Sequence, residues 1–126
     1  MDRYQAVHEF WSSFDLPAYD ETTVPTGEDA PDFPYITYSV SVGALGDYIS
    51  LSASVWYKSN SWHAVSEKVD EIAERVASRG FYKIELDSGY LWLTQGTPFA
   101  QRMSDPEDDQ IRRYYLQLDA EFLTAY

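Results

Sequence analysis

The longest alternation of apolar and polar positions in the chain lies between residues 33 and 57. Apolar side chains alternate there with small hydroxyl side chains in two arms, 35–42 and 48–57. This period of two is typical of half-buried strands, and the Gly-containing connection at 43–47 predicts a β-hairpin. We expect the hydroxyl side chains to form an outward face that another surface can approach closely. The apolar set is Ile36, Tyr38, Val40, Val42, Ile49, Leu51, Ala53 and Val55, and the hydroxyl set is Thr37, Ser39, Ser41, Ser50, Ser52 and Ser54.

Two other stretches have apolar residues at spacings of three and four, which predicts amphipathic helices over residues 2–14 and 61–79. Glu71 and Arg75 are spaced for an i,i+4 ion pair on the second helix, and Gly80 provides a helix stop. Each apolar stripe should face a core, and the apolar side of the hairpin is the nearest surface for the second helix. The first stripe is Tyr4, Val7, Phe10, Trp11 and Phe14, and the second is Trp62, Val65, Val69, Ile72 and Val76.

Three more strands are predicted over residues 81–87, 89–95 and 111–126, since apolar and polar residues alternate in each. Residues 15–32 and 101–109, rich in acidic residues and proline, are expected to be loops. The resulting order is helix, two strands, helix, three strands. It predicts one α+β domain over residues 1–126, in two layers, with an antiparallel or mixed sheet of about five strands and two helices on one face.

Composition narrows the classes of function. The chain has no cysteine, which excludes disulfides, a thiolate zinc site and a cysteine nucleophile. Its net charge of −12 should repel nucleic-acid phosphates, so specific binding of DNA or RNA is not expected. No apolar run is long enough for a membrane span, and the N-terminus lacks the pattern of a signal peptide.

The sequence offers no catalytic or metal-binding motif. His8 and His63 lack the spacing of a zinc site, and no phosphate-binding or nucleophile motif is present. The acidic segment that begins at Asp105 resembles the start of a calcium loop, but Gln110 stands where glycine is needed and Leu116 where glutamate is needed. We therefore expect no catalysis, no cofactor and no metal, and a solvated acidic loop in that segment, with a weaker divalent-ion site there as the alternative that the sequence leaves open.

The order of elements, together with the segment Phe33-Pro34-Tyr35-Ile36-Thr37-Tyr38 that opens the first strand, resembles the tail terminator proteins of long-tailed phages and prophages. These are also called tail-completion or tail-to-head joining proteins. The resemblance implies a virion structural protein that forms a ring, usually a hexamer, and caps the tail tube. One surface of the ring would dock on the major tail protein and the other on the head-completion (stopper) protein.

The resemblance also implies that DNA passes through the ring without specific binding. The location would be the head–tail junction of the virion, after assembly in the host cytoplasm. An acidic lining suits such a conduit because like charges repel. The expected subunit or partner contacts are the hairpin hydroxyls, the acidic loop and the acidic side of the last strand, namely Ser39, Ser41, Ser50, Ser52, Ser54, Asp105, Glu107, Asp108, Asp109, Asp119 and Glu121.

Two other functions remain open on the sequence. A small α+β domain of this kind can bind a small ligand or act in regulation, which would require a pocket with convergent polar groups. A strongly acidic chain can also act as a DNA mimic that inhibits a nucleic-acid enzyme. The mass in solution distinguishes these alternatives, because a ring former assembles with increasing concentration whereas a DNA mimic should stay monomeric or dimeric.

Overall fold

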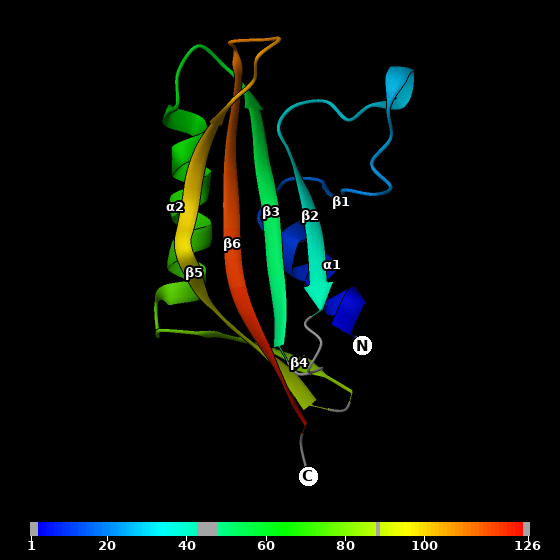
Figure 1. Cartoon of the computed structure of the whole chain (residues 1–126), viewed down its shortest axis with the longest axis vertical. Helices are drawn as coiled ribbons and strands as arrows, with labels where there is room; N and C mark the ends of the chain where they lie inside the picture. Colours follow the sequence, from blue (N-terminus) through cyan, green and yellow to red (C-terminus); the bar gives the residue numbers. More distant parts are fainter. Residues whose placement is uncertain (1–2, 43–47, 88, 125–126) are drawn as a thin grey trace.

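A computed structural model describes residues 3–42, 48–87 and 89–124 of the chain (Figure 1). Within these residues two α-helices and a curled sheet surround one apolar core, so the predicted α+β content is confirmed. The connection predicted at 43–47 lies outside the described residues. In chain order the elements are α1 (Arg3–Ser12), β1 (Ala18–Asp20), the 3-10 turn η1 (Gly27–Asp29), β2 (Tyr35–Val42), β3 (Tyr48–Lys58), α2 (His63–Ala77), β4 (Tyr82–Leu86), β5 (Gly89–Ser104) and β6 (Ile111–Thr124).

The described strands form one mixed sheet of six strands in the order β1-β2-β3-β6-β5-β4, where about five were expected. β1 pairs with β2 in parallel, and every other neighbouring pair is antiparallel. The additional strand, β1, lies in the stretch that we predicted to be a loop. It is held by the β2 register and by a hydrogen bond from the Ile36 amide to the Pro17 carbonyl at 2.9 Å. Three residues are too few to produce an alternation that the sequence could display.

β5 is much longer than predicted, because it does not end at Gln95. It continues to Ser104 through a register shift between Gln95 and Ala100 against β6. A β-bulge of this kind accommodates Pro98, which has no amide hydrogen to donate to a ladder. Gly96 lies so close to β6 that a Cβ there would be 2.9 Å from the Gln117 carbonyl oxygen. The predicted loop at 101–109 is therefore reduced to a tight turn at 105–110 between β5 and β6.

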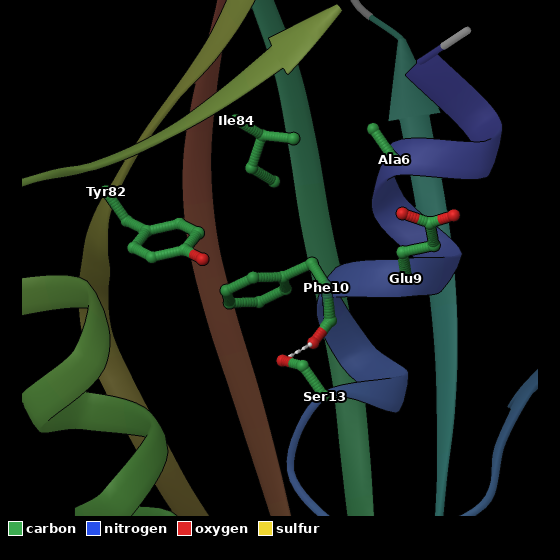
Figure 2. Close-up of a pocket in the computed structure, with 6 residues that line it drawn as sticks. All are labelled: Ala6, Glu9, Phe10, Ser13, Tyr82 and Ile84. Atoms are coloured by element: carbon green, nitrogen blue, oxygen red, sulfur yellow. Dashed lines mark hydrogen bonds between the residues drawn. The ribbon is translucent and has the colours of Figure 1, made fainter. Parts of the chain in front are cut away.

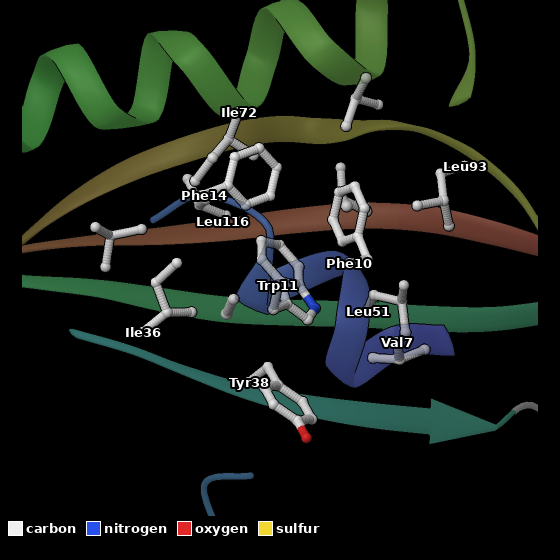
Figure 3. Packing of buried hydrophobic residues seen from close by; sticks show 14 of the residues in the cluster. Val7, Phe10, Trp11, Phe14, Ile36, Tyr38, Leu51, Ile72, Leu93 and Leu116 are labelled. Atoms are coloured by element: carbon white, nitrogen blue, oxygen red, sulfur yellow. The ribbon is translucent and has the colours of Figure 1, made fainter. Parts of the chain in front are cut away.

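The core lies between one face of the sheet and the two described helices (Figure 3). α2 packs over β3, β5 and β6, while α1 packs against β1 and β4 at the two ends of the curled sheet. The predicted stripe of α2 is buried at Val65, Val69, Ile72 and Val76. Tyr4 is the exception on α1, since 59% of its surface is exposed. The buried residues of α1 are Ala6, Val7, Phe10 and Trp11, and Phe14, just after the helix, is buried as well.

Two cations of α2 bind the segment that follows α1. Lys68 Nζ donates to the Phe14 carbonyl at 2.8 Å, and Arg75 donates to the Ser13 carbonyl and hydroxyl. The Ser13 and Phe14 carbonyls lie just beyond α1, so these contacts provide partners for two backbone acceptors outside the helix. The predicted pair of Glu71 with Arg75 is wrong, because Arg75 lies over the Phe14 ring and Glu71 pairs with Lys68 at 3.3 Å.

α1 also packs beside β4, and a small cavity of about 170 Å³ lies along this contact (Figure 2). Figure 2 shows Phe10 of α1 between Tyr82 of β4 and Glu9. The rings of Phe10 and Tyr82 are 5.4 Å apart, centroid to centroid. The contact between α1 and β4 is apolar on the β4 side, and it joins this end of the curled sheet to α1.

Candidate functional site

Among the described residues, no helix covers the second face of the sheet, which we call the open face (Figure 1). The antiparallel register aligns its side chains in rows across β2, β3, β6 and β5. One such row joins Ser39, Ser52 and Gln117, and another joins Thr37, Ser54 and Tyr115. The open face therefore gathers residues that are far apart in the chain into one continuous surface.

Small hydroxyl side chains occupy the centre of the open face. The Ser39 and Ser52 hydroxyl oxygens are 2.7 Å apart and share a hydrogen bond across β2 and β3. Ser50 is exposed and lies opposite Asp119 of β6. We call Ser39, Ser50 and Ser52 the hydroxyl ladder. The backbone of Ser41 pairs with Ser50, while the Ser41 side chain is outside the described part of the chain. These short side chains would let another backbone or side chain approach the sheet closely.

Ser54 lies on the same face but is 4% exposed, so its hydroxyl does not point freely to solvent. Arg113 covers it: the Arg113 Nε donates to the Ser54 hydroxyl at 2.9 Å. The guanidinium carbon of Arg113 also lies 4.6 Å from the centroid of the Trp56 ring, in a cation–π contact. Trp56 in turn donates its indole N–H to the Thr37 hydroxyl at 2.9 Å. Ser54 can therefore make the predicted contact with another molecule only after Arg113 moves.

An aromatic cluster continues the open face beyond Arg113. The rings of Tyr35 and Trp56 are stacked at 6.0 Å with 16° between their planes, and Phe33 and Tyr19 flank Tyr35 at 5.3 and 6.3 Å. Burial raises the pKa of the Tyr35 hydroxyl above its ordinary value. Sequence reasoning missed this cluster, although Tyr35 and Trp56 stand at polar positions of the alternation and so point outward.

The segment between β1 and β2 folds over the aromatic cluster and leaves an open hollow of about 420 Å³. Such a volume is within the range of small-ligand pockets. The hollow lies between the β1–β2 segment and the open face. Its lining is Glu21, Val24, Pro25, Thr26, Gly27, Ala30, Pro31, Tyr35, Thr37, Trp56 and Arg113.

The acidic residues expected to make contacts fall in two places. Asp119 and Glu121 lie on the open face, where Asp119 is exposed and Glu121 is half-buried opposite Trp92. The other four lie far from the hydroxyl ladder, in the turn between β5 and β6. This acidic turn contains Asp105, Glu107, Asp108 and Asp109.

The acidic turn is held by its own hydrogen bonds. The Asp105 carboxylate accepts the backbone amides of Glu107 and Asp108 at 2.8 and 3.2 Å. Asp108 forms an ion pair with Lys58 at 3.2 Å. The pKa of Asp108 is lowered by the amide hydrogen bond from Gln110 and then by Lys58, so this carboxylate stays charged. The turn is thus an ordered, negatively charged end of the β5–β6 hairpin.

The described residues contain no group of three or more histidine and carboxylate side chains arranged to hold a metal ion. The two histidines are apart from each other: His8 contacts the Tyr38 hydroxyl at 2.9 Å, and His63 pairs with Glu67 at 2.9 Å. Within the same residues, neither helix has the length and apolar character of a membrane span. The features that stand out are therefore surfaces, namely the open face and the acidic turn.

Comparison with known proteins adds no assignment to this geometry. No protein-family model matches the chain, and no curated protein matches it significantly.

Proposed function

We propose that this protein is a virion structural protein of the tail-terminator kind, which caps the phage tail tube as a ring and carries out no catalysis. The observation that carries the proposal is the open face with its hydroxyl ladder. A broad sheet face without a helix over it, lined with short polar side chains, is suited to pack against another protein surface. Two features of the sequence support the proposal as well. The Phe33–Tyr38 segment and the order of elements both resemble those of tail terminators.

The arrangement of the layers supports the same proposal. Considered as two layers, the helices are on one side and the sheet on the other, so a subunit can pack through its sheet while its helices keep the core intact. A ring requires head-to-tail contacts between two different surfaces of each subunit. This chain has such different surfaces, because the acidic turn and the aromatic cluster differ in both charge and shape.

Charge supports a role beside DNA. With a net charge of −12, a ring of six copies would carry a formal charge of about six times that value, before counterions are considered. Phosphates would be repelled from such a lining, at distances up to the Debye length of about 8 Å at physiological salt. DNA could then pass through the ring without being held.

The partners follow from this role. We propose a homo-oligomeric ring, with a hexamer as the expected size, that contacts the major tail protein on one side and the head-completion (stopper) protein on the other. The location would be the head–tail junction of the virion, after assembly in the host cytoplasm. Aromatic residues are enriched at subunit contacts, and the cluster around Tyr35 and Trp56 offers such a contact.

One observation favours a second candidate function. The hollow of about 420 Å³ beside Tyr35 and Arg113 could take a small ligand, because aromatic walls and one cation converge there. A thermal-shift screen of metabolites tests this alternative. A clear rise in melting temperature with one ligand, lost in Arg113→Ala, would favour a ligand-binding domain over a ring subunit.

The tail-terminator proposal is tested with Ser50→Arg and its matched control Ser50→Thr. Ser50 is exposed, so both variants should fold, but the long charged side chain would block close approach to the hydroxyl ladder while threonine keeps a small hydroxyl. We expect Ser50→Arg to lower ring formation and capping of tubes made from the cognate major tail protein by at least about tenfold, equivalent to roughly 1.4 kcal/mol. Ser50→Thr should behave like the wild type.

A second pair of variants addresses the acidic side of the open face. Charge reversal at Asp119 and Glu121 should impair assembly, whereas Asp70→Lys on the exposed side of α2 should not. If the Ser50→Arg and the Asp119/Glu121 variants both assemble and join tails normally, the open face is not a contact surface. Binding of the wild type to a nucleic-acid enzyme instead of tail proteins would favour the DNA-mimic alternative.

A further inference from the structure

A hollow rich in cations lies at the end of α2, where this helix meets the β4–β5 pair. Its volume is about 600 Å³. Three of the chain's nine lysine and arginine residues line it, and the described lining contains no carboxylate, although the chain has 21 acidic residues. We call it the basic hollow. It is lined by Arg75, Ser78, Arg79, Phe81, Tyr82, Lys83, Tyr90 and Trp92.

The walls of the basic hollow are aromatic and ordered. Phe81 and Trp92 are stacked with 3.8 Å between their centroids and 12° between their planes. Lys83 Nζ lies 5.1 Å from the centroid of the Tyr90 ring. Such stacked rings provide apolar area at low cost in conformational entropy, as in the anchors of protein–protein interfaces.

None of the three cations pairs with a carboxylate within the described residues. Arg75 instead contacts Ser13 and Phe14, which follow α1. Arg79 and Lys83 are exposed, and neither forms an ion pair within the described residues. Arg79 makes no hydrogen bond within those residues either. These two cations do little to hold the fold and are available to a partner.

The acidic turn offers the complementary group. Glu107 and Asp109 are exposed, and neither forms an ion pair within the described residues. Gln110 Nε2 donates to the Asn60 side-chain oxygen at 3.0 Å, which adds to the hydrogen bonds that already hold the turn. A preorganised turn loses little conformational entropy when it binds. Two available carboxylates on an ordered turn thus match two available cations in an ordered hollow.

The two surfaces cannot meet within one chain. They lie at opposite ends of the β5–β6 hairpin: the acidic turn precedes Ile111, whereas Trp92 pairs with Glu121 (Figure 1). Ten residues separate Ile111 from Glu121, which at about 3.3 Å per residue is roughly 33 Å along the strand. The complement of each surface must therefore come from another molecule.

We propose that the acidic turn of one copy of this chain docks into the basic hollow of the next copy. Glu107 and Asp109 face Arg79 and Lys83 across this junction, and the turn packs on the Phe81–Trp92 stack. The contact is head-to-tail, so it produces a ring when the rotation between copies closes and an open chain when it does not. Only ring closure rests on the function proposed above; the junction itself does not.

Charge exchange tests the junction. One variant reverses the hollow (Arg79→Glu with Lys83→Glu), and the other reverses the turn (Glu107→Lys with Asp109→Lys). Each should self-associate at least about tenfold more weakly than the wild type in sedimentation velocity at low salt. An equimolar mixture of the two should recover association, because each junction then joins opposite charges, and so should the chain that carries all four substitutions. Wild-type association should weaken as salt increases.

Failure to recover in both the mixture and the fourfold variant would overturn the proposal, as would a wild type that stays monomeric at every concentration. All four residues are exposed, and circular dichroism checks that each variant is folded. The competing occupant of the basic hollow is an acidic ligand other than the acidic turn, which short duplex DNA represents in the test. If Arg79→Glu with Lys83→Glu abolishes retention of short duplex DNA while self-association is unchanged, the hollow binds phosphates and the junction is wrong.

A disulfide trap separates the junction from the ring. The chain has no cysteine, so Ser78→Cys in the hollow and Asp109→Cys in the turn are clean probes. Mild oxidation of the mixed variants should give a heterodimer far faster than Asp70→Cys mixed with Asp109→Cys, the control placed on the exposed side of α2. Trapping without annular particles would support the junction and contradict the ring. Rings that form without trapping, and that tolerate the charge reversals, would contradict the junction alone.

Discussion

The arrangement of the open face around Ser54 and Trp56 depends on one side chain, that of Arg113. Its guanidinium lies on Trp56 and its Nε donates to the buried hydroxyl of Ser54. Replacing it with alanine removes both contacts at once. We expect Arg113→Ala to destabilise the domain and to expose Ser54 together with the face of the Trp56 ring.

The size of the effect follows from the two contacts. A cation–π contact at a partly exposed site contributes about 0.5–1 kcal/mol. A hydrogen bond from a charged donor contributes roughly 1–2 kcal/mol here, because Arg113 is only half-buried. The sum is about 2 kcal/mol, since truncation also lets water reach the Ser54 hydroxyl and leaves no unpaired buried group. For a chain of 126 residues this corresponds to a decrease in melting temperature of about 6–10 °C.

The assay is urea unfolding followed by circular dichroism, because fluorescence would also report the changed surroundings of Trp56. Arg79→Ala is the matched control and should change stability by less than about 0.5 kcal/mol, since Arg79 has no ion pair or hydrogen bond within the described residues. A double-mutant cycle of Arg113→Ala with Ser54→Ala should give a coupling energy of about 1 kcal/mol. A coupling near zero, or equal losses for Arg113→Ala and Arg79→Ala, would refute this reasoning.

Three further predictions concern the fold. Gly96→Ala should cost about 1–3 kcal/mol in urea unfolding, because its Cβ would meet the Gln117 carbonyl oxygen at 2.9 Å; an unchanged midpoint would contradict this close approach. Trp11→Phe should stay within about 1 kcal/mol of the wild type, because the buried indole N–H has no partner in the described residues and its removal offsets the cavity; a loss above about 3 kcal/mol would contradict this. The pKa of Asp20 is lowered by hydrogen bonds from the Thr22 hydroxyl and amide, so its charged form stabilises the fold above the unfolded pKa and this contribution is lost as pH falls through the folded value. Asp20→Asn should therefore be less stable than the wild type at pH 7, and the difference should disappear at acidic pH; a difference that is independent of pH would contradict this assignment.

The helices and the long hairpin could be predicted because each has a strong period along the chain. The residues of α2 at spacings of three and four are buried, and those of β2 and β3 alternate between the core and the open face. β1 could not be predicted, because three residues gain their strand geometry only from pairing with β2. The extension of β5 was missed because Gly96 and Pro98 usually end a strand, whereas here they form a bulge against β6.

The candidate site could be predicted in part for a similar reason. The hydroxyl ladder comes from local alternation, which the sequence displays directly. The contact by which Arg113 covers Ser54 could not be predicted from this alternation. Arg113 is 59 residues further along the chain and reaches Ser54 only through the β3–β6 pairing. The basic hollow likewise requires the end of α2 to meet β4 and β5. Its one local signal is Arg75, Arg79 and Lys83 at intervals of four around the end of the helix.

The central claim is that this chain assembles into a closed ring, and electron microscopy of the purified protein at high concentration tests it most directly. We expect annular particles of one size with a central hole, reduced at high salt and by Ser50→Arg but not by Ser50→Thr. A protein that remains monomeric at every concentration, forms no annular particles and does not bind tail-tube protein would contradict the claim.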